Sequence, residues 1–229
     1  MRAFLILALA AAAEPSPAQE AYLYRAQFVQ AAPGRQLEMI ELVKAMKDEP
    51  VFAIRHSQGD KWDLMLLSPV GSYADYYAAD RAARRRKAEQ PEKLRELTAW
   101  QEDLFVFGPP LEDVRAAFSK ASFFHLEIFR ALPGRQADLL KERRMEGAYQ
   151  RTLKRPENLI FTRDQGASWD LFTLGFYRDL KHYAESADIP EKDQDAAAKA
   201  AGFEAATRIG PYLRTIIAEH HDTLAVAVK

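Results

Sequence analysis

The sequence predicts an α+β protein built from two similar β-α-β-β-α-β units that pack sheet to sheet. Residues 24–36 read YRAQFVQAAPGRQ and residues 123–136 read FFHLEIFRALPGRQ, so a strand, a Pro-Gly turn and a helix start occur twice. The segments 58–63 and 165–170 also share Gln-Gly followed by Trp-Asp. Because these landmarks recur in the same order, we expect a tandem duplication of one domain.

The composition is that of an ordinary globular protein. Of the 229 residues, 48% are hydrophobic and 28% are charged. A formal net charge of −1 gives no global attraction to nucleic acid or to an anionic membrane, so neither partner is expected. The chain has no cysteine, which excludes disulfides, a thiol nucleophile and a cysteine-ligated metal site.

The first residues have the pattern of a secretory signal peptide. Arg2 precedes the apolar run AFLILALAAAA at residues 3–13, and the breaker-rich segment EPSPAQ follows at residues 14–19. The run is shorter than the about 20 apolar residues that span a bilayer. We expect cleavage of residues 1–18, a periplasmic or secreted location and no stable membrane span afterwards. A membrane anchor and a disordered tail are the alternatives.

The first unit is expected over residues 21–108. Hydrophobic spacing and turn residues predict, in order, a strand at 21–30, a helix at 34–47, strands at 51–56 and 61–67, helical pieces between 72 and 101, and a strand at 103–107. Residues 109–121 are expected to form a linker that is helical from Leu111 to Lys120.

The second unit, expected over residues 122–229, repeats this order. The predicted elements are a strand at 123–131, a helix at 134–150, strands at 159–162 and 168–174, a helix starting near 178, an Ala-rich helical insert between 190 and 210, a helix at 211–220 and a strand at 222–228. Each unit therefore has the ferredoxin-like order, with helices on one face of an antiparallel sheet. The bare faces of two such sheets can cover each other.

The turn Ala-Leu-Pro-Gly-Arg-Gln at 131–136, the Trp-Asp hairpins and the tandem order resemble the dimeric α/β-barrel superfamily. Within it, residues 21–229 are most similar to the NIPSNAP-like group, with antibiotic-biosynthesis monooxygenase-like domains as relatives. The resemblance implies a pseudo-dimeric α/β barrel, either as a monomer with an internal pseudo-dimer or as a homodimer. It implies a fold more than a function, because members of one fold carry many activities.

The first strand of each unit carries two polar side chains on one face. These are Arg25 and Gln27 in the first unit, and His125 and Glu127 in the second. We expect this face to lie between the two sheets, and the apolar face of Phe124, Leu126 and Ile128 to meet the helices. Buried polar groups need partners, so the cluster predicts either a structural network with an Arg25–Glu127 pair or a ligand site.

Trp62 and Trp169 occupy equivalent places on the predicted hairpin strands, where they either pack in the core or contact a ligand. The resemblance adds a haem alternative. Haem-degrading members of the superfamily carry a polar residue, a tryptophan and a histidine on elements where this chain has Glu127 or His125, Trp169 and His182. The first-strand asparagine of those members is absent here and the Trp-to-His spacing is longer. We therefore expect no cofactor, with haem as the lesser alternative.

The sequence His220-His221-Asp222 is expected where the last helix becomes the last strand. His221 and Asp222 could act as a general base and its orienting carboxylate. The alternative is a histidine that is stabilised by the helix C-terminus beside a turn aspartate. The five histidines show no HxH or HxxxH spacing, so no metal site is expected.

These observations predict an exported barrel protein that binds a small, largely apolar molecule between sheet and helices. His125 or His221 is the expected base. The resemblance implies cofactor-independent monooxygenase-like or proton-transfer chemistry, although the residues alone do not establish that the protein is an enzyme. The alternative is a non-catalytic periplasmic interaction protein that uses its helical faces and the insert between 190 and 210.

Overall fold

The structure is a computed structural model that describes residues 22–46, 52–88 and 90–228. The predicted signal peptide, residues 1–18, lies outside the described residues. Among the described helices, none combines the length and the hydropathy that a bilayer crossing requires.

The first half of the chain has the predicted order of strands and helices. Its elements are β1 (Tyr22–Ala31), α1 (Gln36–Ala45), β2 (Phe52–Gln58), β3 (Leu64–Gly71), α2 (Tyr73–Tyr77), α3 (Ala79–Lys87), α4 (Gln90–Glu96) and β4 (Thr98–Gly108). Helix α5 (Leu111–Lys120) follows, at the position expected for the linker helix.

The second half repeats this order. Its elements are β5 (Phe123–Ala131), α6 (Gln136–Thr152), β6 (Leu159–Gln165), β7 (Leu171–Tyr177), α7 (Leu180–Ala184), the 3-10 turn η1 (Glu185–Asp188), α8 (Glu191–Ala200), the 3-10 turn η2 (Ala206–Arg208), α9 (Ile209–Arg214) and β8 (Ile217–Ala227). The last helix is shorter and the last strand longer than predicted. Pairing with β5 extends β8 back to Ile217, because tertiary contacts override the local helical preference.

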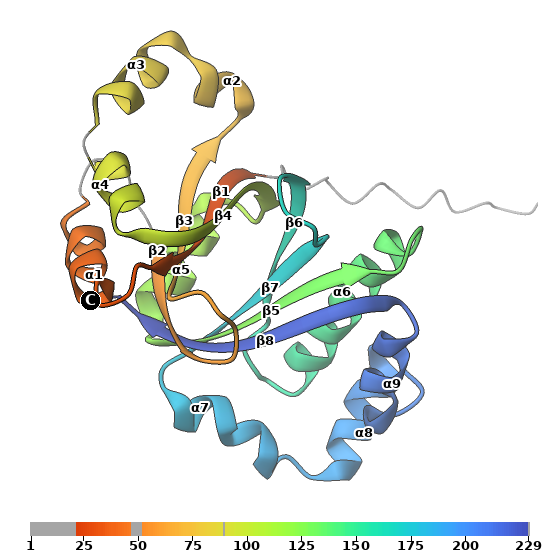
Figure 1. The fold of residues 1–229 in the computed structure, drawn as a ribbon. Coiled ribbons are helices and arrows are strands. Elements are labelled where there is room, and N and C mark those ends of the chain that lie inside the picture. The colour runs from red at the N-terminus through yellow and green to blue at the C-terminus, as the bar shows by residue number, and fades with distance from the viewer. Residues whose placement is uncertain (1–21, 47–51, 89, 229) are drawn as a thin grey trace, which may run out of the picture.

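The eight strands close into one barrel in the order β1-β3-β2-β8-β5-β7-β6-β4, and β4 returns to pair with β1 (Figure 1). All neighbouring strands are antiparallel. Each half supplies four strands in the ferredoxin-like arrangement, β4-β1-β3-β2 and β8-β5-β7-β6. The seams β2–β8 and β4–β6 join the halves, so one chain completes the predicted α/β barrel.

The barrel interior is filled by aromatic and aliphatic side chains from both halves. Its largest members are Tyr24, Phe28, Trp62, Phe124, Phe161, Trp169 and Phe172. Phe161 and Phe172 stack with ring centroids 4.6 Å apart, and Phe28 meets the rings of both tryptophans. Full burial of each such side chain contributes roughly 1.5–3 kcal/mol to folding. The barrel is therefore a packed core.

This packing corrects the predicted strand faces. Phe124, Leu126 and Ile128 point into the barrel, whereas His125 and Glu127 point outward beneath the helices. A closed interior offers charged groups neither water nor enough partners, so the purely apolar face occupies it. The outer face meets amphipathic helices that can supply charged partners.

Helices cover the outer face of each half separately. In Figure 1, α1 and α4 lie on one side of the barrel, and α6, α8 and α9 lie on the other. Met39 and Val43 of α1 pack on Val29 and Leu66 in the first half. In the second half, Leu139 and Leu213 pack on Phe129 and Leu171. Helix α5 contributes Val114 to the core cluster of the barrel.

The recurring Trp-Asp pair has a structural role in both halves. Trp62 and Trp169 precede β3 and β7 rather than lying on them, and this irregular backbone lets both rings enter the barrel. The neighbouring carboxylates hold the ends of the first strands. Asp63 accepts a hydrogen bond from the Ala31 N–H at 2.8 Å, and Asp170 accepts one from Ala131 at 2.8 Å.

The recurring Gln-Gly turn is also explained by close packing. Gly59 has φ +127°, and a Cβ there would lie 2.3 Å from the Asp222 carbonyl oxygen. Gly166 has φ +87°, and a Cβ there would lie 2.6 Å from the Asp103 carbonyl oxygen. Each hairpin turn thus rests on the last strand of the other half, where only glycine fits.

Candidate functional site

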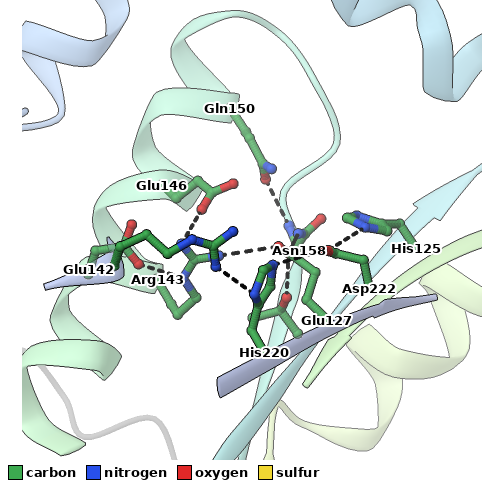
Figure 2. Close-up of polar contacts among 11 residues, drawn as sticks. His125, Glu127, Glu142, Arg143, Glu146, Gln150, Asn158, His220 and Asp222 are labelled. Atoms are coloured by element: carbon green, nitrogen blue, oxygen red, sulfur yellow. Dashed lines mark hydrogen bonds and ion pairs between the residues drawn. The ribbon is translucent and has the colours of Figure 1, made fainter. Parts of the chain in front are cut away.

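A histidine–aspartate pair lies on the outer face of the second sheet. His125 Nε2 of β5 is 3.1 Å from Asp222 Oδ1 of the neighbouring strand β8 (Figure 2). The hydrogen bond from His125 lowers the pKa of Asp222, so this carboxyl stays ionised and Nε2 is the donor. Asp222 therefore fixes the imidazole and leaves Nδ1 as the nitrogen available to another molecule.

The electrostatics around His125 favour its protonated form. Burial alone would lower the pKa of His125, but Asp222, Glu127 and Glu146 together raise it above its ordinary value. The imidazole can therefore accept a proton and hold it beside three acidic groups. This behaviour is what general acid–base catalysis near neutral pH requires.

A second histidine braces the same aspartate. His220 Nε2 is 2.8 Å from Asp222 Oδ2, because residues two apart on a strand share a face. The Arg214 guanidinium lies 2.6 Å from His220 Nδ1 and donates to it, so His220 Nε2 carries the proton that Asp222 accepts. Asp222 is thus held from two sides, and His220 positions it.

Glu127 lies directly opposite Asp222 in the strand register. Its carboxylate accepts hydrogen bonds from Thr173 Oγ1 at 2.8 Å and from Asn158 Nδ2 at 3.1 Å. The Arg143 guanidinium is 3.5 Å from the other carboxylate oxygen. These partners hold a carboxylate that is largely inaccessible to solvent.

Helix α6 places an arginine and two glutamates next to Glu127. The Arg143 side chain is 2% exposed, and its guanidinium lies 2.5 Å from the Glu142 carboxylate and 2.6 Å from the Glu146 carboxylate. Burial raises the pKa of Glu146 to about 7, although Arg143 opposes the shift. Burial also raises the pKa of Glu142. One cation is thus shared by three carboxyls, counting Glu127, and Glu146 titrates near neutral pH.

A cavity of about 460 Å³ opens beside His125, between the outer face of the second sheet and the helices. Three tyrosines provide aromatic walls, and α6, η1 and α8 enclose it. The lining residues are His125, Tyr149, Gln150, Leu153, Arg155, Pro156, Tyr177, Tyr183, Ser186, Ala187, Ile189 and Gln194. A volume of this size suits a small organic molecule.

The lining presents His125 among groups that stay neutral or are already paired. Burial raises the pKa of Tyr177 to about 12 and also raises those of Tyr149 and Tyr183, so these side chains remain phenols. Arg155 is engaged by Glu185 at 2.9 Å and by the His182 carbonyl oxygen. Among the lining residues, His125 is therefore the group that can exchange a proton with a molecule in the cavity.

His125, Glu127 and Asp222 also offer ligand atoms that lie within 4.8 Å of one another. The sequence spacing predicted no metal site, and the group escaped notice because it is formed across two paired strands. Such a set could hold a divalent cation. The Arg143 cation beside Glu127 and the hydrogen bond between His125 and Asp222 favour the proton-transfer role instead.

The structure separates several residues that the sequence grouped together. Arg25 pairs with Asp103 and lies with Gln27 on the outer face of the first half, so the expected Arg25–Glu127 pair does not form. His221 points to the opposite face of β8 from Asp222 and lies 2.9 Å from Glu219. His182 Nδ1 accepts the Arg178 N–H at 3.2 Å, outside the cavity lining.

Sequence reasoning missed the helix and loop residues of the site. Arg143, Glu146, Tyr149 and Tyr183 contact this face from α6 and α7, whose placement the strand pattern does not reveal. One signal was present, because α6 carries Glu142-Arg143 beside Leu139 on its buried side. A charged pair on a helix face that should be apolar indicates a buried polar network.

No protein-family model matches the chain, and no curated protein sequence matches it. Solved structures do. An anthrone oxidase-like protein aligns with a TM-score of 0.56 and 14% identity over 93% of both chains. A proposed monooxygenase from Lactobacillus acidophilus aligns with a TM-score of 0.55 and 9% identity over 92% of this chain and 95% of that chain. A proposed monooxygenase from Fusobacterium nucleatum aligns with a TM-score of 0.52 and 8% identity over 91% of this chain and 93% of that chain.

The residues that the resemblance offered for haem do not come together. Trp169 lies inside the barrel, His125 and Glu127 lie outside it, and His182 lies beyond the cavity lining. Haem-binding and chlorite dismutase structures match only at TM-scores of 0.45 to 0.48, too distant to carry an argument. At the identities above, the comparisons establish the fold alone, an α/β barrel that this chain shares with the three solved structures.

Proposed function

We propose that the protein binds a small, largely aromatic molecule in the cavity beside His125 and removes a proton from it. The observation that carries this proposal is the His125–Asp222 pair at the wall of a cavity of about 460 Å³. His125 Nδ1 accepts the proton, and the carboxylate of Asp222 stabilises the imidazolium that forms. Glu127 and Glu146 add to this stabilisation.

The resulting substrate anion can react with O₂ without a cofactor. Loss of a methylene proton from an anthrone gives a carbanion, which transfers electrons to O₂. Uptake of one O₂ and release of one water convert the methylene group into a carbonyl. The fold shared with an anthrone oxidase-like protein and with two proposed monooxygenases supports this reaction class. The tyrosine walls suit a flat aromatic substrate.

An oxygen-uptake assay with anthrone tests the proposal. We expect saturable O₂ consumption, and a fall in kcat of about 10²–10⁴-fold in His125→Gln, because general-base catalysis contributes that much. His182→Gln, outside the cavity lining, is the matched control and should retain activity. Unchanged turnover in His125→Gln would remove this residue from the reaction. No binding of anthrone by calorimetry would refute the ligand assignment itself.

The alternative role as an interaction protein relied partly on the insert between 190 and 210. Its helix α8 buries Ala197 and Ala198, and α8 packs against α6 of the same chain. This face therefore helps to enclose the cavity and is not free for a partner. The cavity favours small-molecule binding over the docking role.

The proposal includes export, a monomeric state and an origin within the NIPSNAP-like group by duplication. Residues 1–18 support export. The identical strand order of the two halves supports duplication, and barrel closure within one chain supports a monomer. Fractionation of an exporting host with N-terminal sequencing, and light scattering of the mature protein, test location and mass. A cytoplasmic full-length chain or a stable dimer would overturn the corresponding part.

A further inference from the structure

A second cavity, of about 200 Å³, lies at the end of the barrel where the β2–β3 and β6–β7 turns meet. The chain contains three tryptophans, and all three line this cavity. Trp62 and Trp169 form its floor with Phe28 between them, and the half-buried Trp100 of β4 forms a wall. The walls are thus aromatic faces from both halves of the molecule.

Carboxylates surround these rings. Glu102, Asp60 and Glu219 line the cavity, together with the cations Lys61 and Arg130 and the imidazole of His221. Arg130 is neutralised by Glu219 at 2.7 Å. Trp169 Nε1 donates to Glu102 at 3.0 Å, which fixes that carboxylate against the aromatic floor without neutralising it. Two carboxylates, Asp60 and Glu102, therefore face the Lys61 ammonium, the remaining permanent cation of the lining, and Asp60 also lies 3.7 Å from His221 Nδ1.

That cation already shows what the cavity accepts. The Lys61 ammonium lies 4.2 Å from the centroid of the Trp100 ring, in a cation–π contact. Lys61 is exposed on the turn, so its ammonium can leave the ring for solvent at little cost. A tryptophan face next to carboxylates is the combination that recognises ammonium groups.

We propose that the mouth of the barrel binds a small organic cation, a quaternary ammonium or a protonated amine, whose charge replaces the Lys61 ammonium over Trp100. Glu102 and Asp60 supply the negative charge, and Trp62 and Trp169 contact the alkyl groups. This site does not depend on the function proposed for the His125 cavity, because it opens on the opposite face of the sheet.

Titration with tetramethylammonium chloride tests the proposal, with intrinsic fluorescence as the readout because every tryptophan lines the cavity. We expect a saturable change that sodium chloride at equal ionic strength does not reproduce. Lys61→Met should tighten binding by at least about threefold, because it removes the competing ammonium. Glu102→Gln should weaken the binding of tetramethylammonium by at least about threefold, although the glutamine can still accept the hydrogen bond from Trp169 Nε1.

The gain of affinity in Lys61→Met cannot arise from misfolding, so it separates a specific site from a damaged protein. Trp100→Leu should abolish binding while leaving the circular-dichroism melting curve cooperative. A linear response, an equal response to sodium chloride, or identical affinities in wild type, Lys61→Met and Glu102→Gln would overturn the proposal. Anthrone turnover should be the same in Lys61→Met as in wild type.

Discussion

His125 and Asp222 meet across β5 and β8 at the position where Arg25 and Asp103 meet across β1 and β4. Asp222 is the register partner of Glu127, and Asp103 is the register partner of Gln27. Asp222 and Asp103 therefore occupy equivalent positions in the two halves. Arg25 Nε donates to Asp103 at 2.8 Å, whereas His125 Nε2 lies 3.1 Å from Asp222. One half thus holds a permanent cation where the other holds a titratable imidazole.

This equivalence points to a division of labour between the halves. A guanidinium stays charged at every physiological pH, so Arg25 with Asp103 can only bind or stabilise. An imidazole can exchange a proton near pH 7, so His125 with Asp222 can do chemistry. The His125 pair also borders the cavity of about 460 Å³.

The first prediction concerns the proton on His125. Its raised pKa should appear in an NMR titration as a midpoint above about 6.5, the ordinary value for histidine. In Asp222→Asn the midpoint should fall, because the main group that favours the imidazolium is gone. Stability follows the same sign: the contribution of His125 is complete below pH of about 6.5 and is lost as pH rises through the folded pKa. An unshifted midpoint in Asp222→Asn would contradict the pairing.

The second prediction concerns Arg143, which is buried among Glu127, Glu142 and Glu146. Arg143→Met should lower the free energy of unfolding by about 3–5 kcal/mol, because it leaves buried carboxylates without their cation. Its exposed neighbour gives the matched control, and Arg144→Met should change stability by less than about 0.5 kcal/mol. Urea unfolding measures both, and equal losses would show that Arg143 does not anchor the cluster.

The third prediction concerns Glu146, whose pKa is raised to about 7. The protonated carboxyl is favoured in the native state, so wild type should lose stability between pH of about 4.5 and 7 relative to Glu146→Gln. The difference between pH 5 and pH 8 should be on the order of 2 kcal/mol. Glu204→Gln, at an exposed position, should follow wild type. Parallel pH profiles for wild type and Glu146→Gln would refute the shift.

The fourth prediction concerns the turn glycines. Gly59→Ala and Gly166→Ala should each destabilise the protein by about 1–3 kcal/mol or more, because both positions combine positive φ with a backbone contact. Gly210→Ala should act in the opposite direction, by about 0.5–1 kcal/mol, since this residue lies in α9 with open space around it. Thermal melting distinguishes the signs. A neutral Gly166→Ala would refute the close approach to β4.

Local patterns in the sequence determined the elements and their order. Alternating residues, the Pro-Gly turns and the shared Gln-Gly and Trp-Asp landmarks predicted both β-α-β-β-α-β halves, and the resemblance to the dimeric α/β-barrel superfamily implied the barrel. They succeeded because turns and strands depend on neighbouring residues.

Only the tertiary structure decided which face of each strand points inward. Alternation separates Leu126 from Glu127 but does not say which side is the barrel, and a closed interior admits the apolar side alone. The meeting of His125 with Asp222 depends on the β5–β8 register, and the cavity beside them depends on how α6 and η1 dock. The sequence by itself therefore determined the architecture and named His125, Glu127 and Asp222 separately. Long-range pairing brought them together, because residues far apart in the chain become neighbours only when the barrel closes.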